Sequence, residues 1–286
     1  MKTSTEIGSI AKICGEEKAI EYVAKAGFDA WDFSLFDLCR YDRKNFTVLK
    51  TGHALEGTNY LSYSRKLRQL GEDNGIICNQ THAPFPLEVT EVRSNMKRAI
   101  ECTAEVGASV CVIHPQKNLS PKENAQIYME LLPFAKEYRV KLAAENIWNW
   151  DSENKRALFA ACSTPESFCE HLNAVDDDNF VACLDIGHAE MMGSDVSAVR
   201  MIKALGSKLQ ALHIHDNDKR IDHHQIPFSM DIDFVSIVKA LKEIDYKGFF
   251  TMESTDFFTP FTKDNIFDGV KTLSLTARKL ADMFDE

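Results

Sequence analysis

Two apolar runs of this chain end in imidazole and carboxylate side chains. CLDIGHAE places Asp185 and His188 three residues apart, and LHIHDND contains His213 and His215. Imidazole and carboxylate groups bind divalent metal ions and transfer protons near neutral pH. A buried carboxylate is costly unless it is paired or coordinates a cation. The two runs therefore indicate a metal site as the first hypothesis to consider.

Similar polar residues end most of the other β-rich runs of the chain. Such runs cover residues 30–35, 75–82, 109–114, 141–146, 180–188, 209–216 and 248–254, with a weaker one at 4–10. The polar side chains at or just past their ends are His82, His114, Glu145, Asp185, His188, His213, His215 and Glu253. A single histidine at such a place is usually a structural hydrogen-bonding group. Six runs that end in this way favour a shared metal site. His53 lies away from these ends and is expected to be structural. In a regular strand His215 would point opposite to its neighbours and support the site from behind.

Helical patterns alternate with these runs. Apolar residues recur at helical spacing in residues 16–27, 89–108, 120–138, 164–175, 233–248 and 264–284. The first pattern stops at Gly27, as helices often do. Ser-Pro and Thr-Pro pairs open the third and fourth patterns, as an N-cap followed by a proline in the first turn. We expect Pro133 to kink or shorten the third helix.

The order of these elements predicts an α/β protein, a (β/α)8 TIM barrel. About eight β-then-α units fit in about 250 residues, and the continuous apolar strands are typical of a parallel sheet buried on both faces. A doubly wound sheet is the alternative, but it usually carries a Gly-rich loop after its first strand, which this chain lacks. We expect residues 1–286 to form one domain. In a barrel the C-terminal ends of the strands converge on one mouth, where the polar residues would meet.

Composition narrows the function classes. The chain has 286 residues, 44% of them apolar, and a net charge of −10. Its eight cysteines form no C-x-x-C pair, which argues against a disulfide framework and a zinc ribbon. Neither a signal-peptide pattern nor an apolar run of 18 residues is present. We therefore expect a cytoplasmic protein without a membrane partner, and the acidic balance makes nucleic acid an unexpected partner.

The ordered set THAPFP, VIHP, AAEN, LDIGHA, LHIHD, IDHHQIP and MES resembles the xylose isomerase-like barrel superfamily. That superfamily includes sugar-phosphate isomerases and epimerases, ketose 3-epimerases and apurinic-site endonucleases. The resemblance to the epimerases implies one divalent metal bound by Glu145, Asp185, His213 and Glu253. It also implies that the two glutamates act as acid and base, and that His188 contacts substrate oxygens.

The endonucleases of the superfamily use more ligands, in a three-metal cluster. Resemblance to them adds His82, His114, His188, Asp222 and His224 as ligands. All five residue types are present, so the ligand set leaves a multinuclear site open. A DNA groove needs several phosphate contacts. The basic side chains of the loop after the second run are Arg40, Arg43, Lys44 and Lys50. We interpret this loop as a solvated lid.

The chemistry of the residues agrees with a sugar site. Isomerising a hydroxy-ketone requires one carboxylate to remove a proton beside a carbonyl and another to return it, while a metal stabilises the enediolate. Trp148, with His82, His114 and His188, is expected to contact the sugar. The oxygen and nitrogen ligands favour zinc or manganese, with magnesium or cobalt as alternatives.

Three functions therefore compete. The leading one is a metal-dependent isomerase or epimerase of a sugar or sugar phosphate. The others are an endonuclease-type phosphodiesterase, and a lyase or dehydratase on a sugar-like or inositol-like substrate. Whether the chain forms a homo-oligomer stays open.

Overall fold

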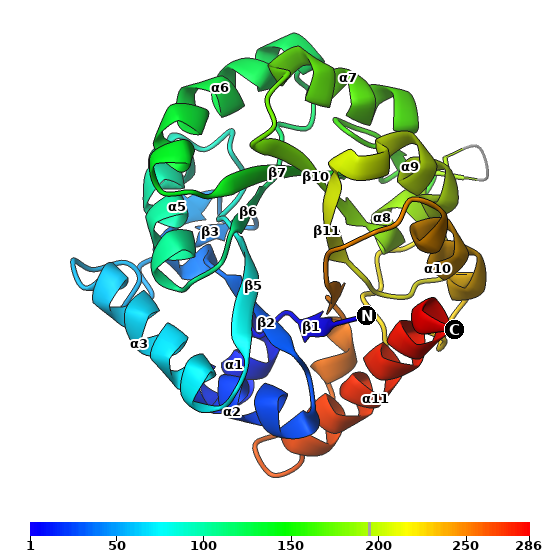
Figure 1. Cartoon of the computed structure of the whole chain (residues 1–286). Helices are drawn as coiled ribbons and strands as arrows, with labels where there is room; N and C mark the ends of the chain where they lie inside the picture. The colour runs from blue at the N-terminus through cyan, green and yellow to red at the C-terminus, as the bar shows by residue number, and fades with distance from the viewer. Residues whose placement is uncertain (194–195) are drawn as a thin grey trace.

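The computed structural model describes residues 1–193 and 196–286, and its strands form a barrel inside a ring of helices (Figure 1). The barrel strands are β1 (Thr3–Thr5), β2 (Ala30–Ser34), β5 (Ile77–His82), β6 (Val110–Ile113), β7 (Lys141–Glu145), β10 (Phe180–Asp185), β11 (Leu209–His213) and β12 (Phe250–Met252). Strands β11-β10-β7-β6-β5-β2 form a parallel sheet, and β1 pairs in parallel with β12. The bridges Glu6–Asp32 and Ile214–Met252 join the two sheets and close the barrel. The predicted (β/α)8 barrel is confirmed.

The helices cover the outside of the barrel. They are α1 (Gly8–Cys14), α2 (Glu16–Ala26), α3 (Tyr60–Asp73), α4 (Thr90–Ser94), α5 (Met96–Glu105), α6 (Pro121–Glu137), α7 (Pro165–Val175), α8 (Ile186–Glu190), α9 (Ala198–Leu205), α10 (Phe234–Glu243) and α11 (Ile266–Asp285). Gly27 ends α2 with φ of 96°, as predicted. Ser120 and Glu123 form a capping box at α6, and the Thr164 hydroxyl caps α7. Within the described residues, no helix is both long and apolar enough to cross a membrane.

Two helix predictions need correction. Residues 89–108 do not form one helix, because α4 and α5 meet at Asn95, whose side-chain amide donates to the Glu91 carbonyl. A side chain that bonds the backbone in this way competes with helical hydrogen bonding. Helix α6 contains Pro133 and continues to Glu137, so of the kink or shortening predicted there, the shortening is wrong.

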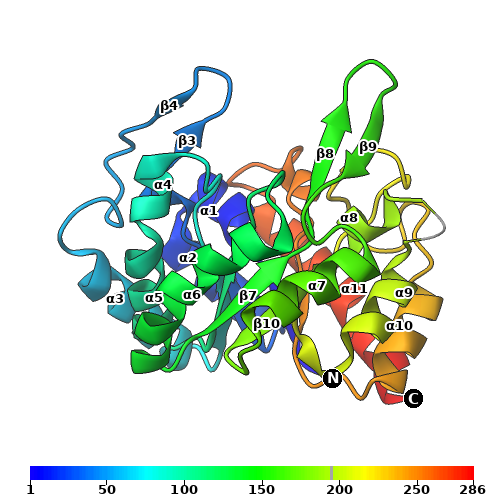
Figure 2. The ribbon, with the colours of Figure 1, turned by 90° about the horizontal axis from the view of Figure 1, so that it is seen from above.

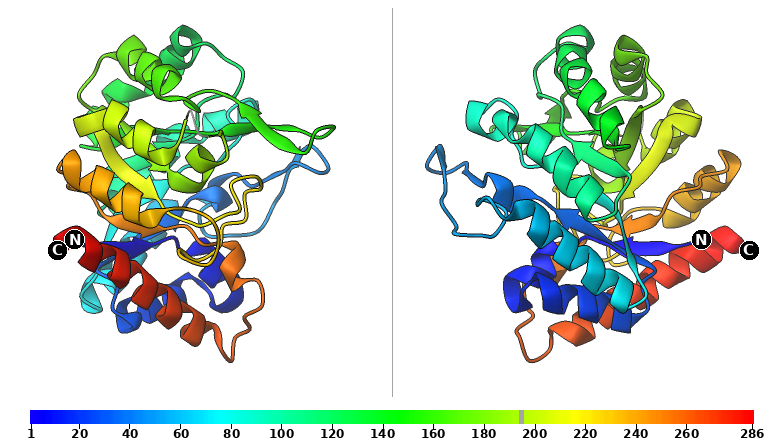
Figure 3. Two further views of the ribbon diagram at one scale, coloured as in Figure 1. Left: turned by 90° about the vertical axis from the view of Figure 1, so that its right-hand side faces the viewer. Right: turned by 60° about the vertical axis from the view of Figure 1, so that its left-hand side comes forward.

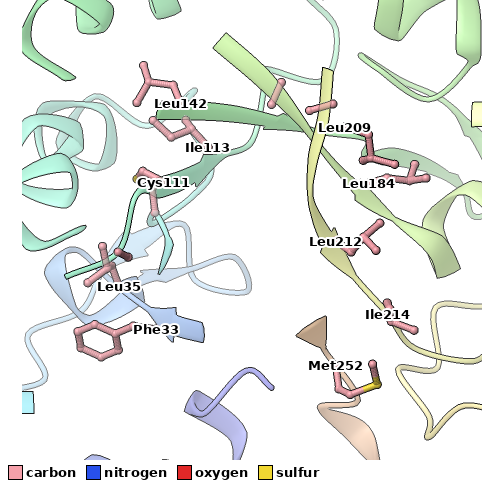
Figure 4. Close-up of a cluster of buried hydrophobic side chains, with 14 of the residues drawn as sticks. Phe33, Leu35, Cys111, Ile113, Leu142, Leu184, Leu209, Leu212, Ile214 and Met252 are labelled. Atoms are coloured by element: carbon pink, nitrogen blue, oxygen red, sulfur yellow. The ribbon is translucent and has the colours of Figure 1, made fainter. Parts of the chain in front are cut away.

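Side chains alternate between two cores along the strands. A small inner cluster contains Val110, Val112, Ala143, Val181, Cys183 and Ala211. The other face of the strands joins the apolar faces of the helices, and Figure 4 shows Leu142, Leu184 and Leu212 among these residues. Because the side-chain period of a strand is two, the inner series continues into the last residue of three strands. Those residues are Glu145, Asp185 and His213.

Two hairpins extend beyond one end of the barrel (Figure 2). Strands β3 (Tyr41–Asp42) and β4 (Thr47–Val48) form one, and β8 (Trp148–Asp151) and β9 (Arg156–Phe159) form the other. The chain termini lie side by side at the opposite end (Figure 3), where the amino group of Met1 pairs with Asp285. The hairpins therefore lie at the C-terminal ends of the barrel strands, opposite the chain termini.

Candidate active site

The polar strand ends surround one cavity at the mouth of the barrel. Its volume is about 540 Å³. The predicted site residues that line it are His82, His114, Glu145, Trp148, His188, Asp222, His224 and Glu253. Asp185 and His213 are fully buried next to these residues. The structure thus brings together every side chain that the sequence singled out for the site.

The four residues expected to hold one metal form a compact group. Single ligand atoms from Glu145, Asp185, His213 and Glu253 all lie within 4.8 Å of one another. The Glu145 side chain is 1% exposed, whereas Glu253 is 12% exposed and borders the cavity. Glu253 is therefore the carboxylate of the pair that a substrate can reach more easily.

Glu145 also belongs to a second group, with His82 and His114. Its Oε1 lies 2.6 Å from Nδ1 of His213, while its Oε2 lies 2.8 Å from Nε2 of His114 and 3.1 Å from Nε2 of His82. The two oxygens therefore face two different sets of imidazoles. Glu145 therefore offers one oxygen to each of the two groups.

A third group lies around Asp222. Ligand atoms of His188, His215, Asp222 and His224 lie within 4.8 Å of one another. Oδ2 of Asp222 is 3.2 Å from Nε2 of both His188 and His224. All nine residues named from the epimerase and endonuclease resemblances therefore occur in three adjoining groups.

The histidines are oriented by hydrogen bonds on the ring nitrogen that faces away from each group. Nδ1 of His82, His188 and His224 lies within 3.0 Å of the carbonyl oxygens of Ala83, Asn146 and Glu253 respectively. When one ring nitrogen holds the proton and donates it to a carbonyl, the other ring nitrogen has a free lone pair that can bind a metal. Burial lowers the pKa of His114 to about 4, which also favours its neutral form.

Asp32 orients His213 in the same way, and it was not predicted from the sequence. Its Oδ2 lies 3.1 Å from Nε2 of His213 and accepts a hydrogen bond from the Gln80 amide at 3.0 Å. This contact leaves Nδ1 of His213 facing Glu145. A carboxylate behind a histidine ligand increases its basicity and fixes its ring. Asp32 stands alone in AWDFS, so its only sequence signal was an acidic residue inside a buried strand.

Glu6, at the end of β1, is a second missed residue of the cavity. It is 5% exposed and accepts hydrogen bonds from the backbone N–H of Gly8 and from the hydroxyls of Ser9 and Ser34. These donors hold the carboxylate in a fixed position at the cavity wall. His53, expected to be structural, also lines the cavity and bonds Glu16.

The donor atoms fit a divalent cation. Within the described part of the chain, Oδ2 of Asp185 and Oδ1 of Asp222 are buried without a hydrogen-bond partner, as is Nδ1 of His215. Buried polar atoms are normally satisfied, so these atoms point to a missing partner such as a cation. Cys183 lies near His213, but burial raises the pKa of its thiol to about 12, which disfavours a thiolate ligand.

The two glutamates differ in their electrostatics as well as in exposure. Burial raises the pKa of the Glu253 carboxyl above its usual value, against the lowering effect of His213 and His224. Burial acts in the same direction on Glu145, but His213 and His114 hold its pKa well below the usual range. The surroundings of Glu145 therefore favour its charged form more strongly than the surroundings of Glu253 favour that of Glu253.

His215 was expected to point away from its neighbours and to support them from behind. The structure instead places it in the third group, with Nε2 3.1 Å from Oδ1 of Asp185. Strand alternation does not extend to His215, because β11 ends at His213. His215 can lie there because residue 187 is glycine: a Cβ on Gly187 would be 1.9 Å from its ring.

The Gly187→Ala variant is therefore expected to lower the free energy of unfolding by about 1–3 kcal/mol, the usual cost of overpacking. Urea denaturation would measure the loss. Gly57→Ala is the matched control, because its Cβ would meet only the Ala54 carbonyl at 3.8 Å. Combining Gly187→Ala with His215→Ala should recover part of the lost free energy of unfolding. Equal stability of the Gly187 and Gly57 variants would contradict the packing described.

Comparison with known proteins agrees with this architecture. The profile of the family described as "Xylose isomerase-like TIM barrel" matches residues 20–270. The chain belongs to the xylose isomerase-like TIM barrel family. An uncharacterised protein of Methanocaldococcus jannaschii is 28% identical over 277 residues, covering 89% of this chain and 81% of the relative.

Several solved structures share the fold at low identity. A D-tagatose 3-epimerase-like protein has a TM-score of 0.71 at 22% identity, with 99% of each chain covered. The IolI protein, solved with a bound zinc atom, has a TM-score of 0.69 at 20% identity, covering 100% of this chain and 98% of the other. At these identities the likeness establishes the barrel, and the activity must be argued from the site.

Proposed function

We propose that the protein is a divalent-metal-dependent isomerase or epimerase that acts on a sugar or sugar phosphate. One observation carries the proposal: Glu145, Asp185, His213 and Glu253 converge at the mouth of the barrel, with Glu253 facing a cavity of about 540 Å³. Similar folds include a D-tagatose 3-epimerase-like protein and a D-psicose 3-epimerase solved with D-fructose, which supports a sugar as substrate.

The four residues of this group would hold the cation. A bound divalent cation would polarise the substrate carbonyl and stabilise the negative charge of an enediolate. Asp185 and His213 are fully buried and act as ligands only. Imidazole nitrogens and carboxylate oxygens suit zinc or manganese best, with magnesium and cobalt as alternatives.

Glu253 is the residue that we assign to proton removal. Its nearest imidazole contacts, 3.7 Å to His213 and 3.9 Å to His224, are longer than those of Glu145, so one oxygen can turn toward a substrate. Glu145 lies on β7, three strands away from β12, and we assign it to returning the proton on the other face of the reacting carbon. His188 is the alternative donor on that side.

The remaining cavity residues would bind the sugar. His82, His114 and His188 present polar ring atoms, and Trp148 offers an aromatic face near His188, with ring centroids 6.3 Å apart. Phe36 and Phe85 extend the aromatic wall beside His82. We propose a small-molecule substrate in a cytoplasmic protein.

Proton exchange from solvent tests the function. The metal-loaded protein, incubated with ketoses and their phosphates in deuterium oxide, should place deuterium on the carbon beside the carbonyl, which mass spectrometry detects. Loss of water or another leaving group from the substrate would instead indicate a lyase. No exchange with any ketose would contradict the proposal.

A phosphodiesterase is the second candidate, because the groups around Glu145 and Asp222 can hold further cations. Incision of a duplex with an abasic site at physiological salt would favour it. We expect no incision above background, because a DNA groove requires several phosphate contacts and the chain carries a net charge of −10.

A further inference from the structure

Two cationic side chains at the cavity mouth come from different loops. Arg43 belongs to the β3–β4 hairpin, and Lys117 follows β6 before α6 begins. Both line the cavity that contains the ligand groups. Burial lowers the pKa of the Lys117 ammonium, and the positive charge of Arg43 lowers it further. Two like charges held near one another suggest that a negative group belongs between them.

Each cation rests on an aromatic ring that also contacts a histidine of the site. The Arg43 guanidinium lies 5.0 Å from the centre of the Phe85 ring, and Phe85 lies 4.5 Å from the His114 ring. The Lys117 ammonium lies 5.4 Å from the Trp148 ring, and Trp148 lies 6.3 Å from the His188 ring. These contacts place both side chains beside histidines of the second and third groups.

Neither charge has a carboxylate partner in the described part of the chain. No carboxylate oxygen of those residues lies within 4.0 Å of either group, whereas Arg40, on the same loop as Arg43, is bidentate on Asp37 at 2.7 and 2.9 Å. Burial lowers the pKa of both groups and the negative charge of Glu88 raises it, but Oε1 of Glu88 accepts a hydrogen bond from the backbone N–H of Lys117 at 3.3 Å rather than from either cation. The Lys117 ammonium donates to the Trp148 carbonyl at 2.8 Å, which leaves two of its three donors for a ligand.

We infer that Arg43 and Lys117 form a subsite for an oxyanion carried by the substrate, a phosphate monoester or a carboxylate. This inference rests on the proposed function and narrows its substrate class to anionic sugars or sugar acids. The guanidinium offers a planar pair of donors that matches an oxyanion, and the ammonium adds a second charge. The aromatic stacks place the anion at the rim, while the neutral part of the substrate reaches the ligand groups.

Titration calorimetry of the metal-loaded protein with inorganic phosphate and with acetate tests the subsite. The double variant Arg43→Gln, Lys117→Gln should bind the preferred anion about tenfold to a hundredfold more weakly than the unchanged protein, as expected for lost hydrogen bonds to a charged group. Lys44→Gln is the matched control, because Lys44 is exposed on the same hairpin and does not line the cavity. Stronger binding of phosphate assigns a phosphate ester, and stronger binding of acetate assigns a carboxylate.

Equal affinity of the double variant and the unchanged protein for both anions would overturn the subsite, since the anion would then be held by the metal alone. Undetectable binding of both anions to the unchanged protein would also overturn it. Metal content and circular dichroism of each variant show whether the site and the fold persist. The titration needs no turnover, so an absence of proton exchange with ketoses would reject the proposed reaction without deciding the subsite.

Discussion

Replacing Glu253 with glutamine is expected to lower turnover by about 10²–10⁴-fold, the usual contribution of a positioned general base. Glutamine keeps the shape of the side chain and one oxygen for a cation but cannot take up a proton. Substrate affinity should change far less than turnover, because the loss concerns the transition state. Steady-state kinetics with the ketose that shows solvent exchange would measure both quantities.

The Glu145→Gln variant separates base from ligand. Both oxygens of Glu145 face imidazoles, so this change should reduce metal content as well as turnover, whereas Glu253→Gln should mainly reduce turnover. Glu17→Gln serves as the control, because Glu17 is an exposed partner of Lys66 outside the cavity. If both cavity variants kept near-normal turnover with metal bound, the two-carboxylate mechanism would be wrong and His188 would become the preferred base.

The grouping of the candidate site residues could be predicted from the sequence, because a closed barrel brings the ends of its strands together. Parallel strands of a closed barrel all end at one mouth, so a polar residue at each strand end needs no further information to be placed there. Inward-facing alternation then brings Glu145, Asp185 and His213 to the same face. The resemblance added Asp222 and His224, which lie on a loop that no periodicity could place.

The residues that orient the candidate metal ligands could not be predicted from the sequence. Asp32 and Glu6 are single acidic residues in short strands, and spacing carries no information about a single residue. His215 was misplaced because the end of β11 could not be located to within two residues, and strand alternation ends there. The β8–β9 hairpin was missed as well, although WNWDSENKRALF contains a polar turn between two apolar segments.

The local helix at CLDIGHAE shows why a strand ends in this pattern. Strand β10 stops at Asp185, whose Oδ1 accepts a hydrogen bond at 2.7 Å from the His188 backbone N–H and so caps α8. This turn directs the His188 ring toward Asp222. Oδ2 of Asp185 keeps no partner among the described residues and faces the ligand group. One residue thus ends the strand, starts the helix and offers a candidate ligand atom.

Removing that ligand should have the largest effect on metal binding. Purified protein is expected to contain about one or more equivalents of a divalent transition ion, and Asp185→Ala should lose most of it, because the change deletes a fully buried charged ligand. Asp32→Asn leaves every ligand in place but weakens the support of His213, and should lower metal affinity by about 10–100-fold. Elemental analysis after dialysis against a graded chelator would order the variants.

Asp37→Asn is the matched control for both changes. Asp37 lines the same cavity but is paired with Arg40 and lies outside the three groups described above, so its amide should leave the metal content unchanged. The order of metal affinity should therefore be unchanged protein and Asp37→Asn, then Asp32→Asn, then Asp185→Ala. Protein that contains no metal after purification, and whose proton exchange with ketoses withstands chelator, would remove the metal from the mechanism. The orphaned oxygens of Asp185 and Asp222 would then need another partner, and a buried water that donates to both would be the simplest one.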